Sequence, residues 1–258
     1  MTFTNAQQRF SNRVADYVRY RPSYPSEVLT VLRTECDLSP GHVIADIGSG
    51  TGLLSELFLK NGNRVYGVEP NKDMRAAGEE YLAAYDGFCS VDGAAENTLL
   101  SDRSVDFVAA GQAFHWFEPG KTRAEFRRIL RSQGWVVAIW NFRDRETPFG
   151  MAYEDILVKY GTDYQRVRGS YPAGHDLSGF FAGGKLFERT LPGTRVLSWD
   201  ELAGLLQSAS YTPQKSDANF AAMMGALREL FLKHQENGRV TWNYTTHIYF
   251  GQLPGSAN

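Results

Sequence analysis

The sequence predicts a protein of the α/β class, in which helices cover both faces of a mostly parallel sheet. Strand-like and helical segments alternate from Val43 to Asn141, and this alternation is typical of parallel strands joined by helical crossovers. A glycine-rich turn follows the first strand-like segment, at the edge where such sheets bind ligands. The chain has 258 residues, which is enough for one such domain with a substantial core.

The N-terminal part of the chain predicts a helical arm. Phe10, Val14 and Tyr17 fall at helical spacing. The segment RPSYP at 21–25 interrupts this pattern, and the apolar residues of 28–32 resume it. Two helices separated by a turn are therefore expected before the first strand.

The central part of the chain predicts strands and helices in strict alternation. The strands are short apolar runs, and the helices have apolar residues three or four positions apart. We expect strands at 42–47, 64–70, 87–91, 104–111 and 134–141, and helices at 53–62, 72–85 and 121–134.

The regular alternation ends after Asn141. Residues 142–185 are rich in glycine and aromatic side chains without clean periodicity, so we interpret them as a lid insertion. Beyond them, the pattern predicts strands at 187–198 and 239–253 and helices at 199–209 and 217–238. We expect a single domain over 1–258, made of an N-terminal helical arm (1–40), a core (41–141), the insertion (142–185) and a C-terminal part (186–258) that completes the sheet.

Composition and charge argue against several classes of function. Lysine and arginine number 27 against 29 aspartates and glutamates, a net charge of −2 without a basic run, so no nucleic-acid partner is expected. Cys36 and Cys89 lack metal or redox spacing and the five histidines are scattered, so we expect neither a metal site nor a disulfide framework. The N-terminus has no apolar core of signal-peptide length, and the apolar run at 135–140 is too short to span a bilayer. We therefore expect a cytoplasmic protein with no membrane partner.

A glycine turn and an acidic residue together predict a nucleoside site. Gly48, Gly50 and Gly52 follow the first strand, and glycine lets the main chain approach a ligand closely. Glu69 ends the next strand, 21 positions after Gly48, which is the spacing at which an acidic side chain reaches ribose hydroxyls in such sheets.

The spacing of the glycines favours S-adenosylmethionine over a dinucleotide. The dinucleotide pattern is G-x-G-x-x-G, whereas this turn has G-x-G-x-G with Asp46 two residues before the first glycine. A carboxylate there opposes a pyrophosphate but suits the ammonium group that S-adenosylmethionine carries.

Several segments resemble the class I S-adenosylmethionine-dependent methyltransferases of the type 11 group. These segments are VIADIGSGTG, VYGVEPN, DGAAENTLL, SVDFVAAGQAFHWF and GWVVAIWN. FSNRVADYVRYRPSYP, WNFRDRETPF, SASY and TTHIYFG are similar to the trans-aconitate-methyltransferase-like subgroup. The resemblance implies a Rossmann-like, seven-stranded, mostly parallel sheet with an antiparallel last strand at 239–251, and an arm that folds over the cofactor.

The resemblance also implies cofactor contacts at matching positions. The methionine moiety is expected to contact Asp46, Gly48, Ser49, Gly50 and Gly52. Glu69 is expected to bind the ribose, and Pro70 and Met74 to flank the adenine. Gln112 is expected at the mouth of the pocket or as a strand-end cap, and Arg21 at the cofactor carboxylate, at the acceptor or as a helix anchor.

The residue that contacts the adenine amino group stays open. Many relatives carry aspartate where this chain has Ala94. Asp92, Glu96 or the main chain of Ala95 are the alternatives.

The acceptor is expected beside the ends of the fourth and fifth strands. His115 is a candidate general base, or a histidine satisfied by main chain in a helical turn. Trp116, Asn141 and Tyr20 are candidate substrate contacts.

Arginines near the end of the fifth strand suggest an anionic acceptor. Arg143 or Arg145 is expected to clamp the anion or to form an ion pair with Asp144. An ionised carboxylate needs chiefly positioning, whereas an amine or hydroxyl acceptor makes a base more useful.

We therefore expect a methyltransferase that acts on a small molecule, with a carboxylic acid as the first candidate, and that works as a monomer or homodimer. The product of the cofactor would be S-adenosylhomocysteine. Two alternatives remain: a catalytically silent S-adenosylmethionine-binding regulatory protein, and an NAD-dependent oxidoreductase, which the glycine spacing disfavours.

Overall fold

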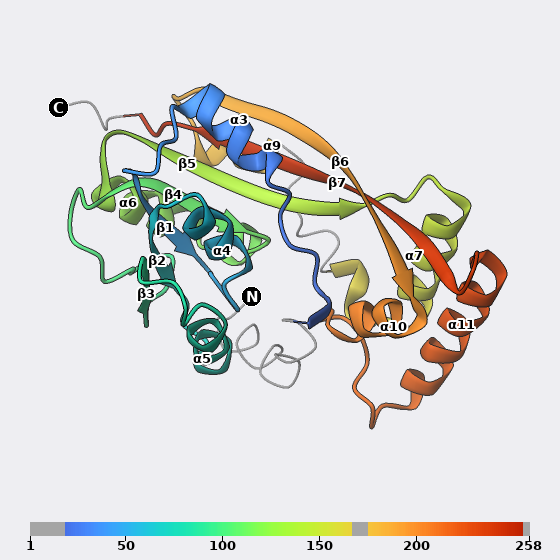
Figure 1. Cartoon of the computed structure of the whole chain (residues 1–258). Helices are drawn as coiled ribbons and strands as arrows, with labels where there is room; N and C mark the ends of the chain where they lie inside the picture. The colour runs from blue at the N-terminus through green and yellow to red at the C-terminus, as the bar shows by residue number, and fades with distance from the viewer. Residues whose placement is uncertain (1–18, 167–174, 255–258) are drawn as a thin grey trace.

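A computed structural model describes residues 19–166 and 175–254 of the chain (Figure 1). The first predicted helix, over Phe10 to Tyr17, lies outside these ranges.

A seven-stranded sheet organises the described part of the chain, with the order β3-β2-β1-β4-β5-β7-β6. The strands are β1 (Val43–Ile47), β2 (Arg64–Val68), β3 (Phe88–Val91), β4 (Val105–Gly111), β5 (Leu130–Arg143), β6 (Leu186–Ser198) and β7 (Arg239–Gly251). Neighbours among β1 to β5 are parallel, whereas β7 runs antiparallel to both β5 and β6. The predicted mostly parallel sheet and its reversed last strand are confirmed.

The strand order also places the ligand-binding edge. β1 lies between β2 and β4, so the chain leaves β1 toward one side of the sheet and later returns to the other side. In doubly wound sheets, ligands bind outside the carboxyl ends of the strands at this switch point.

Helices occupy both faces of the sheet, as predicted. The helices are α3 (Glu27–Cys36), α4 (Leu53–Lys60), α5 (Lys72–Tyr81), α6 (Pro119–Ile129), α7 (Pro148–Tyr160), α9 (His175–Phe180), α10 (Trp199–Gln207) and α11 (Ala218–His234), with a 3-10 turn η1 (Phe114–Trp116). Alternate residues of β5 enter opposite cores, because side chains along a strand point alternately to its two faces. Trp140 packs in the core that contains α6 and α9, and Ile139 in the core that contains α3 and α4.

The predicted helix over 121–134 was too long. α6 ends at Ile129, and Leu130 already has extended backbone angles and pairs with Val105. The side chain of Leu130 is 2% exposed, so pairing and burial of this residue in the sheet outweigh the helical periodicity of the sequence. A shift in register then follows before Trp135 pairs with Phe107.

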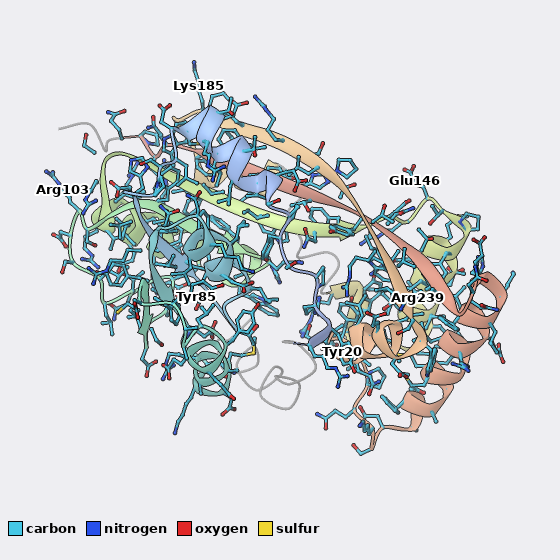
Figure 2. The ribbon with its side chains drawn as sticks, in the orientation of Figure 1. Tyr20, Tyr85, Arg103, Glu146, Lys185 and Arg239 are labelled. Atoms are coloured by element: carbon cyan, nitrogen blue, oxygen red, sulfur yellow. The ribbon has the colours of Figure 1, made fainter. Side chains whose placement is uncertain are left out.

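A third hydrophobic core lies at the far ends of β6 and β7. Helices α7, α10 and α11, which we call the helical subdomain, pack there through side chains that include Tyr153, Leu206, Leu227 and Trp242. Figure 1 shows this subdomain at the end of the long strands that is remote from β1 to β3. In Figure 2, Arg239 marks the same end.

The predicted lid insertion therefore contributes helix α7 to a packed core. α7 contacts α11 within the helical subdomain. The division of the chain into a single domain, and lid closure by 142–185, stay predictions.

No helix within 19–166 or 175–254 has the length and hydropathy to cross a membrane. Within the same ranges, no three potential metal ligands cluster together, and Cys36 and Cys89 are both free thiols.

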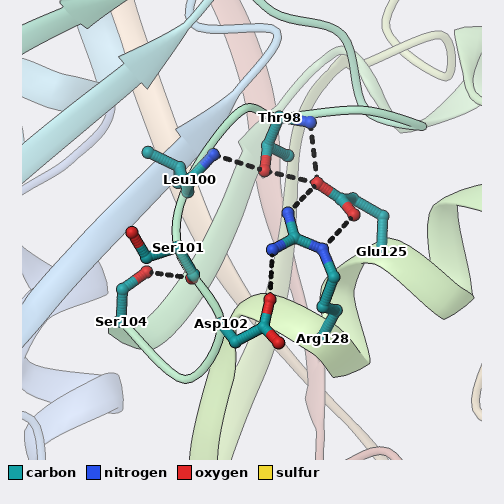
Figure 3. Close-up of polar contacts among 7 residues, drawn as sticks. All are labelled: Thr98, Leu100, Ser101, Asp102, Ser104, Glu125 and Arg128. Atoms are coloured by element: carbon teal, nitrogen blue, oxygen red, sulfur yellow. Dashed lines mark hydrogen bonds and ion pairs between the residues drawn. The ribbon is translucent and has the colours of Figure 1, made fainter.

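A polar network holds the loop between β3 and β4 against α6 (Figure 3). The main-chain N–H and hydroxyl of Thr98 donate to Glu125 at 2.7 and 2.6 Å. Arg128 donates to both oxygens of Glu125, at 2.8 and 2.7 Å, and to Asp102 at 2.6 Å. Glu125 is only 8% exposed, so these donors satisfy a carboxylate that would be costly to bury alone.

We expect Glu125→Gln to lower the free energy of unfolding by about 1–3 kcal/mol at pH 7. Burial alone would raise the pKa of Glu125. Its bonds to Arg128 and Thr98 have the larger effect, so the pKa lies below its ordinary value of 4.5. A depressed pKa gives stability that is present above the unfolded value and is lost as the pH falls through the folded value. The difference between variant and wild type should therefore shrink below about pH 4.5.

Urea denaturation at pH 7 and at pH 4 measures this difference. Glu79→Gln is the matched control, because Glu79 is exposed and contacts a single hydroxyl, that of Ser90. Equal urea midpoints for Glu125→Gln and wild type at pH 7 would rule out the stabilising role of the network.

Candidate active site

The glycine turn leaves β1 and enters α4 in a conformation that only glycine accommodates. Gly48 and Gly52 have φ values of +69° and +87°. A Cβ on Gly48 would lie 2.6 Å from Cβ of Ala113, and one on Gly52 would lie 2.6 Å from Cδ1 of Leu82. The turn therefore presents bare main chain at the carboxyl end of the sheet.

Glu69 ties the end of β2 to this turn. Its two carboxylate oxygens accept the N–H groups of Gly50 at 2.9 Å and of Asn71 at 2.8 Å. Burial raises the pKa of Glu69, and the two main-chain hydrogen bonds only partly oppose this rise. Each carboxylate oxygen has more than one lone pair, so the side chain retains acceptor capacity beyond these two bonds.

Asp46 carries a buried carboxylate that is only partly satisfied. The Ser55 hydroxyl donates to its Oδ2 at 2.6 Å. Its Oδ1 is buried and meets no hydrogen-bond donor among the described residues. Burial raises the pKa of Asp46 to about 7. A buried acceptor of this kind is expected where a ligand supplies the missing donor.

A pocket, which we call the glycine-turn cavity, opens beside these groups. Its walls are Arg21, Pro22, Tyr24, Asp46, Gly48, Ser49, Gly50, Thr51, Leu53, Leu54, Gly111 and Gln112.

A second pocket lies between the sheet and the helical subdomain. We call it the arginine cavity, and its walls are Arg21, Pro22, Gln112, Asn141, Phe142, Arg143, Arg145, Tyr153, Tyr164, Leu205, Ala209, Tyr211, Trp242 and Tyr244. Arg21, Pro22 and Gln112 line both cavities. The two cavities therefore adjoin at the carboxyl end of β4.

Gln112 holds a costly backbone conformation at this junction. Its φ of +56° lies in the left-handed region, which costs a residue other than glycine about 1–3 kcal/mol. A hydrogen bond from its N–H to the carbonyl of Ile139, at 2.8 Å, holds the main chain in place. Such conformations cluster at functional sites.

Positive charge dominates the arginine cavity. Arg143 donates to Glu154 and Tyr164, and Nε of Arg145 lies 3.5 Å from Glu154. Burial would lower the pKa of Arg143, but Tyr211, Tyr164, Tyr153 and Glu154 raise it above its ordinary value. The predicted ion pair with Asp144 was therefore wrong, because Glu154 is the partner of both arginines.

Two guanidinium groups that line this cavity thus share one carboxylate, that of Glu154, which is not itself among the lining residues. Asn141 adds a neutral donor, since its Oδ1 accepts the Thr246 hydroxyl at 2.6 Å and its Nδ2 is buried without an acceptor among the described residues. The walls accordingly suit a ligand that carries oxygen acceptors and negative charge.

Six predicted cofactor contacts line neither cavity: Gly52, Glu69, Pro70, Met74, Ala95 and Glu96. Of the candidate base and substrate contacts, three also line neither cavity: His115, Trp116 and Tyr20. Burial lowers the pKa of His115 to about 4, so its imidazole is neutral at pH 7 and accepts protons weakly. The rings of His115 and Trp116 lie 4.8 Å apart, centre to centre. The roles of these three residues stay predictions.

The residues predicted to surround the adenine comprise buried apolar groups and two acids that already have hydrogen-bond or ion-pair partners. Met74 and Ala95 are 5% and 4% exposed, whereas Pro70 is half-buried. Asp92 pairs with Arg75 at 2.9 Å, and Glu96 accepts the N–H of Glu118 at 2.8 Å. Among the three alternatives for the adenine amino group, we therefore favour the main chain of Ala95.

Sequence reasoning missed most of the aromatic wall of the arginine cavity. Tyr153 and Tyr164 lie in or just after α7, where no motif marked them. Trp242 and Tyr244 did carry a signal, because residues two apart on a strand share a face.

We expect Asp46→Asn to stabilise the ligand-free protein at high pH. A raised pKa gives stability that is present below the unfolded value of 3.8 and is lost as the pH rises through about 7. The amide carries no charge and can still accept from Ser55, so the variant should exceed wild type in unfolding free energy by up to about 4 kcal/mol at pH 8.

Urea denaturation at pH 5 and pH 8 checks this expectation. The difference in unfolding free energy between Asp46→Asn and wild type should be smaller at pH 5 than at pH 8. The exposed Asp155→Asn variant is the control. A variant that is no more stable than wild type at pH 8 would contradict a buried, desolvated charge at Asp46.

Residues 45–138 match the family described as "Methyltransferase domain". An uncharacterized methyltransferase of Mycobacterium tuberculosis is 35% identical over 152 residues, which cover 59% of this chain and 60% of the relative. An uncharacterized methyltransferase of Schizosaccharomyces pombe is 31% identical, covering 58% of this chain and 59% of the relative. The matched segment thus spans about 60% of the length of these relatives.

Solved structures share the fold over most of the chain. A protein from Anaeromyxobacter dehalogenans, named as a type II methyltransferase, has a TM-score of 0.62 and 24% identity, with 91% of this chain and 99% of that chain covered. A phosphoethanolamine N-methyltransferase of Haemonchus contortus, solved with S-adenosylhomocysteine, has a TM-score of 0.57 and 14% identity, with 98% and 59% covered.

These relatives do not bear on the trans-aconitate-methyltransferase-like subgroup, which stays a prediction. The chain is thus similar in sequence to methyltransferases over somewhat more than half of its length, including the domain match at 45–138, and it shares their fold over most of its length.

Proposed function

We propose that the protein is an S-adenosylmethionine-dependent methyltransferase whose acceptor is a small anionic molecule, with a carboxylic acid as the first candidate. One observation carries this proposal: the glycine-turn cavity and the arginine cavity adjoin, and Arg21, Pro22 and Gln112 line both. A methyl donor in the first and an acceptor in the second would meet at that junction.

The residues of the glycine-turn cavity fit the proposed cofactor. The buried Oδ1 of Asp46 offers an acceptor for the ammonium of the methionine moiety. Glu69 lies beside the cavity, where it accepts the N–H of Gly50, and it retains acceptor capacity for the two ribose hydroxyls. Arg21 lies at the junction, where its cation could pair with the carboxylate of the methionine moiety. When bound, the cofactor supplies an electrophilic methyl group. The complex of the Haemonchus neighbour with S-adenosylhomocysteine supports this reading of the fold.

The walls of the arginine cavity favour an acceptor that is already ionised. No carboxylate or imidazole is among the described residues that line this cavity. Burial raises the pKa of Tyr164 to about 12 and also raises that of Tyr153, so these phenols stay protonated at neutral pH. Among the described lining residues, no carboxylate or imidazole is thus available as a general base, and an ionised carboxylate acceptor needs none.

Charge argues for an oxygen acceptor over an amine. Arg21, Arg143 and Arg145 line this cavity, and Arg143 and Arg145 pair with the same carboxylate, that of Glu154. A protonated amine would enter a positive site and would first have to lose a proton. A carboxylate instead finds donors whose geometry matches its two oxygens. Positioning and exclusion of water would then supply the catalysis.

We expect Glu69→Ala to weaken the binding of S-adenosylhomocysteine by about 1–3 kcal/mol, because charged hydrogen bonds are lost. Calorimetric titration of the purified protein measures this change. Glu80→Ala is the control, since Glu80 is exposed on the same helix as Met74. NAD should not bind in a parallel titration, and unchanged affinity of Glu69→Ala for S-adenosylhomocysteine would refute the ribose role.

We expect a panel of small carboxylic acids to contain an acceptor, detected by formation of S-adenosylhomocysteine, and the matched amines to contain none. With that acceptor, Arg145→Gln should raise KM about tenfold with little change in kcat, because a charged contact to the bound acid is lost. Arg166→Gln is the control, since Arg166 is exposed and pairs with Asp163 on the surface.

Methylation of an amine in place of an acid would contradict the proposed acceptor class. Clear cofactor binding without turnover of any acceptor in a broad panel would instead favour a silent binding protein.

A further inference from the structure

A short segment before α3 bridges the two halves of the protein. We call residues 19–25 the strap. In Figure 1 the chain before α3 runs from the sheet to α10, and Figure 2 places Tyr20 beside that helix. Arg21 and Pro22, in the middle of the strap, line both the glycine-turn cavity and the arginine cavity.

One end of the strap is held by the helical subdomain. The ring of Tyr20 lies against the main chain of Gly204 in α10, so closely that a Cβ on Gly204 would lie 2.5 Å from Cγ of the ring. Arg195 donates to the carbonyl of Tyr20 at 3.0 Å, and Arg21 donates to the carbonyl of Ser208 at 3.3 Å.

The other end of the strap is held by the sheet. Tyr24 packs with the core that contains α3 and α4. A Cβ on Gly111, the last residue of β4, would lie 2.8 Å from Cζ of the Tyr24 ring. Arg21 thus lies between two tyrosines that are packed in different halves of the protein: Tyr20 against the helical subdomain and Tyr24 against the sheet.

Nothing within α10 itself requires glycine at position 204. The residue lies inside the helix and does not have a positive φ, and glycine is less favourable than alanine in a helix interior. The ring of Tyr20 supplies the reason for the small residue, because any side chain would overlap it.

We infer that the contact between Tyr20 and Gly204 is a latch that positions Arg21 for the cofactor. Gly204 lines neither cavity, so it acts through Tyr20 as a positioning residue. This role rests on the proposed cofactor, and it makes the affinity of the glycine-turn cavity depend on a helix of the other half of the protein.

Gly204→Ala tests the latch, with Gly225→Ala as its matched control. Both glycines are inside helices of the helical subdomain, but a Cβ on Gly225 would meet nothing within 4 Å. Gly204→Ala should bind S-adenosylhomocysteine about tenfold more weakly than wild type, as expected when a charged contact is misplaced. Its Tm should stay equal to wild type or rise, since alanine favours the helix. Gly225→Ala should keep the wild-type affinity.

A double-mutant cycle with Tyr20→Ala isolates the pair. If Gly204 acts through the ring, Tyr20→Ala also weakens binding, and adding Gly204→Ala to it causes no further loss. Additive losses would overturn the latch, because Gly204 would then act independently of Tyr20. Wild-type affinity in Gly204→Ala would overturn it as well.

Hydrogen exchange without ligand separates the latch from the proposed cofactor. The strap amides should exchange faster in Gly204→Ala than in Gly225→Ala, whether or not S-adenosylhomocysteine binds. If wild type does not bind S-adenosylhomocysteine, the proposed function and the role of the latch in affinity fail, while faster exchange still supports the contact itself. Equal exchange in both variants would overturn the latch.

Discussion

The length of the last three strands is the constraint on which the site depends. β5, β6 and β7 have 14, 13 and 13 residues, whereas β1 and β2 have five each. The helices beside β1 to β4 cannot cover strands of that length, so the outer ends need a second layer. α7, α10 and α11 supply it and form a separate core with the ends of β6 and β7. The arginine cavity lies in the seam between the cores, and its position thus follows from burying the long strands.

The two cavities differ in charge. Among the described residues, one carboxylate and one guanidinium line the glycine-turn cavity, whereas three guanidinium groups and no carboxylate line the arginine cavity. Both arrangements have a cost in the ligand-free protein. Asp46 holds a desolvated carboxylate with one oxygen unsatisfied by the described residues. Arg143 and Arg145 share a single carboxylate, that of Glu154. Buried charge of this kind destabilises a free protein unless partners compensate it. Ligands of complementary charge supply such partners. The buried charges that destabilise the free protein would therefore contribute to the free energy of binding and to selectivity for such ligands.

Local patterns in the sequence were enough to predict the parallel sheet, the glycine turn after β1 and the position of Glu69 at the end of β2. Each of these depends on a repeat or spacing within one βαβ unit. The end of α6 was mispredicted because burial of Leu130 in the sheet competes with helical periodicity. The walls of the arginine cavity were predicted only in part, through Arg21, Gln112, Asn141, Arg143 and Arg145. The remaining walls, and the contact of Tyr20 with Gly204, join residues far apart in the chain. Such contacts leave no periodic pattern in the sequence, so only the structure shows them.

Sharing Arg21 between the cavities has a thermodynamic consequence. The guanidinium has one position at a time, and the strap that carries it is anchored to both cores through Tyr20 and Tyr24. If the proposed cofactor and acceptor occupy the two cavities, a ligand that orders Arg21 in one of them would therefore change the free energy of binding in the other. Linkage makes this effect reciprocal: the factor by which a bound cofactor changes acceptor affinity equals the factor by which acceptor changes cofactor affinity. Coupling between the two sites thus needs no large domain motion, because one side chain belongs to both.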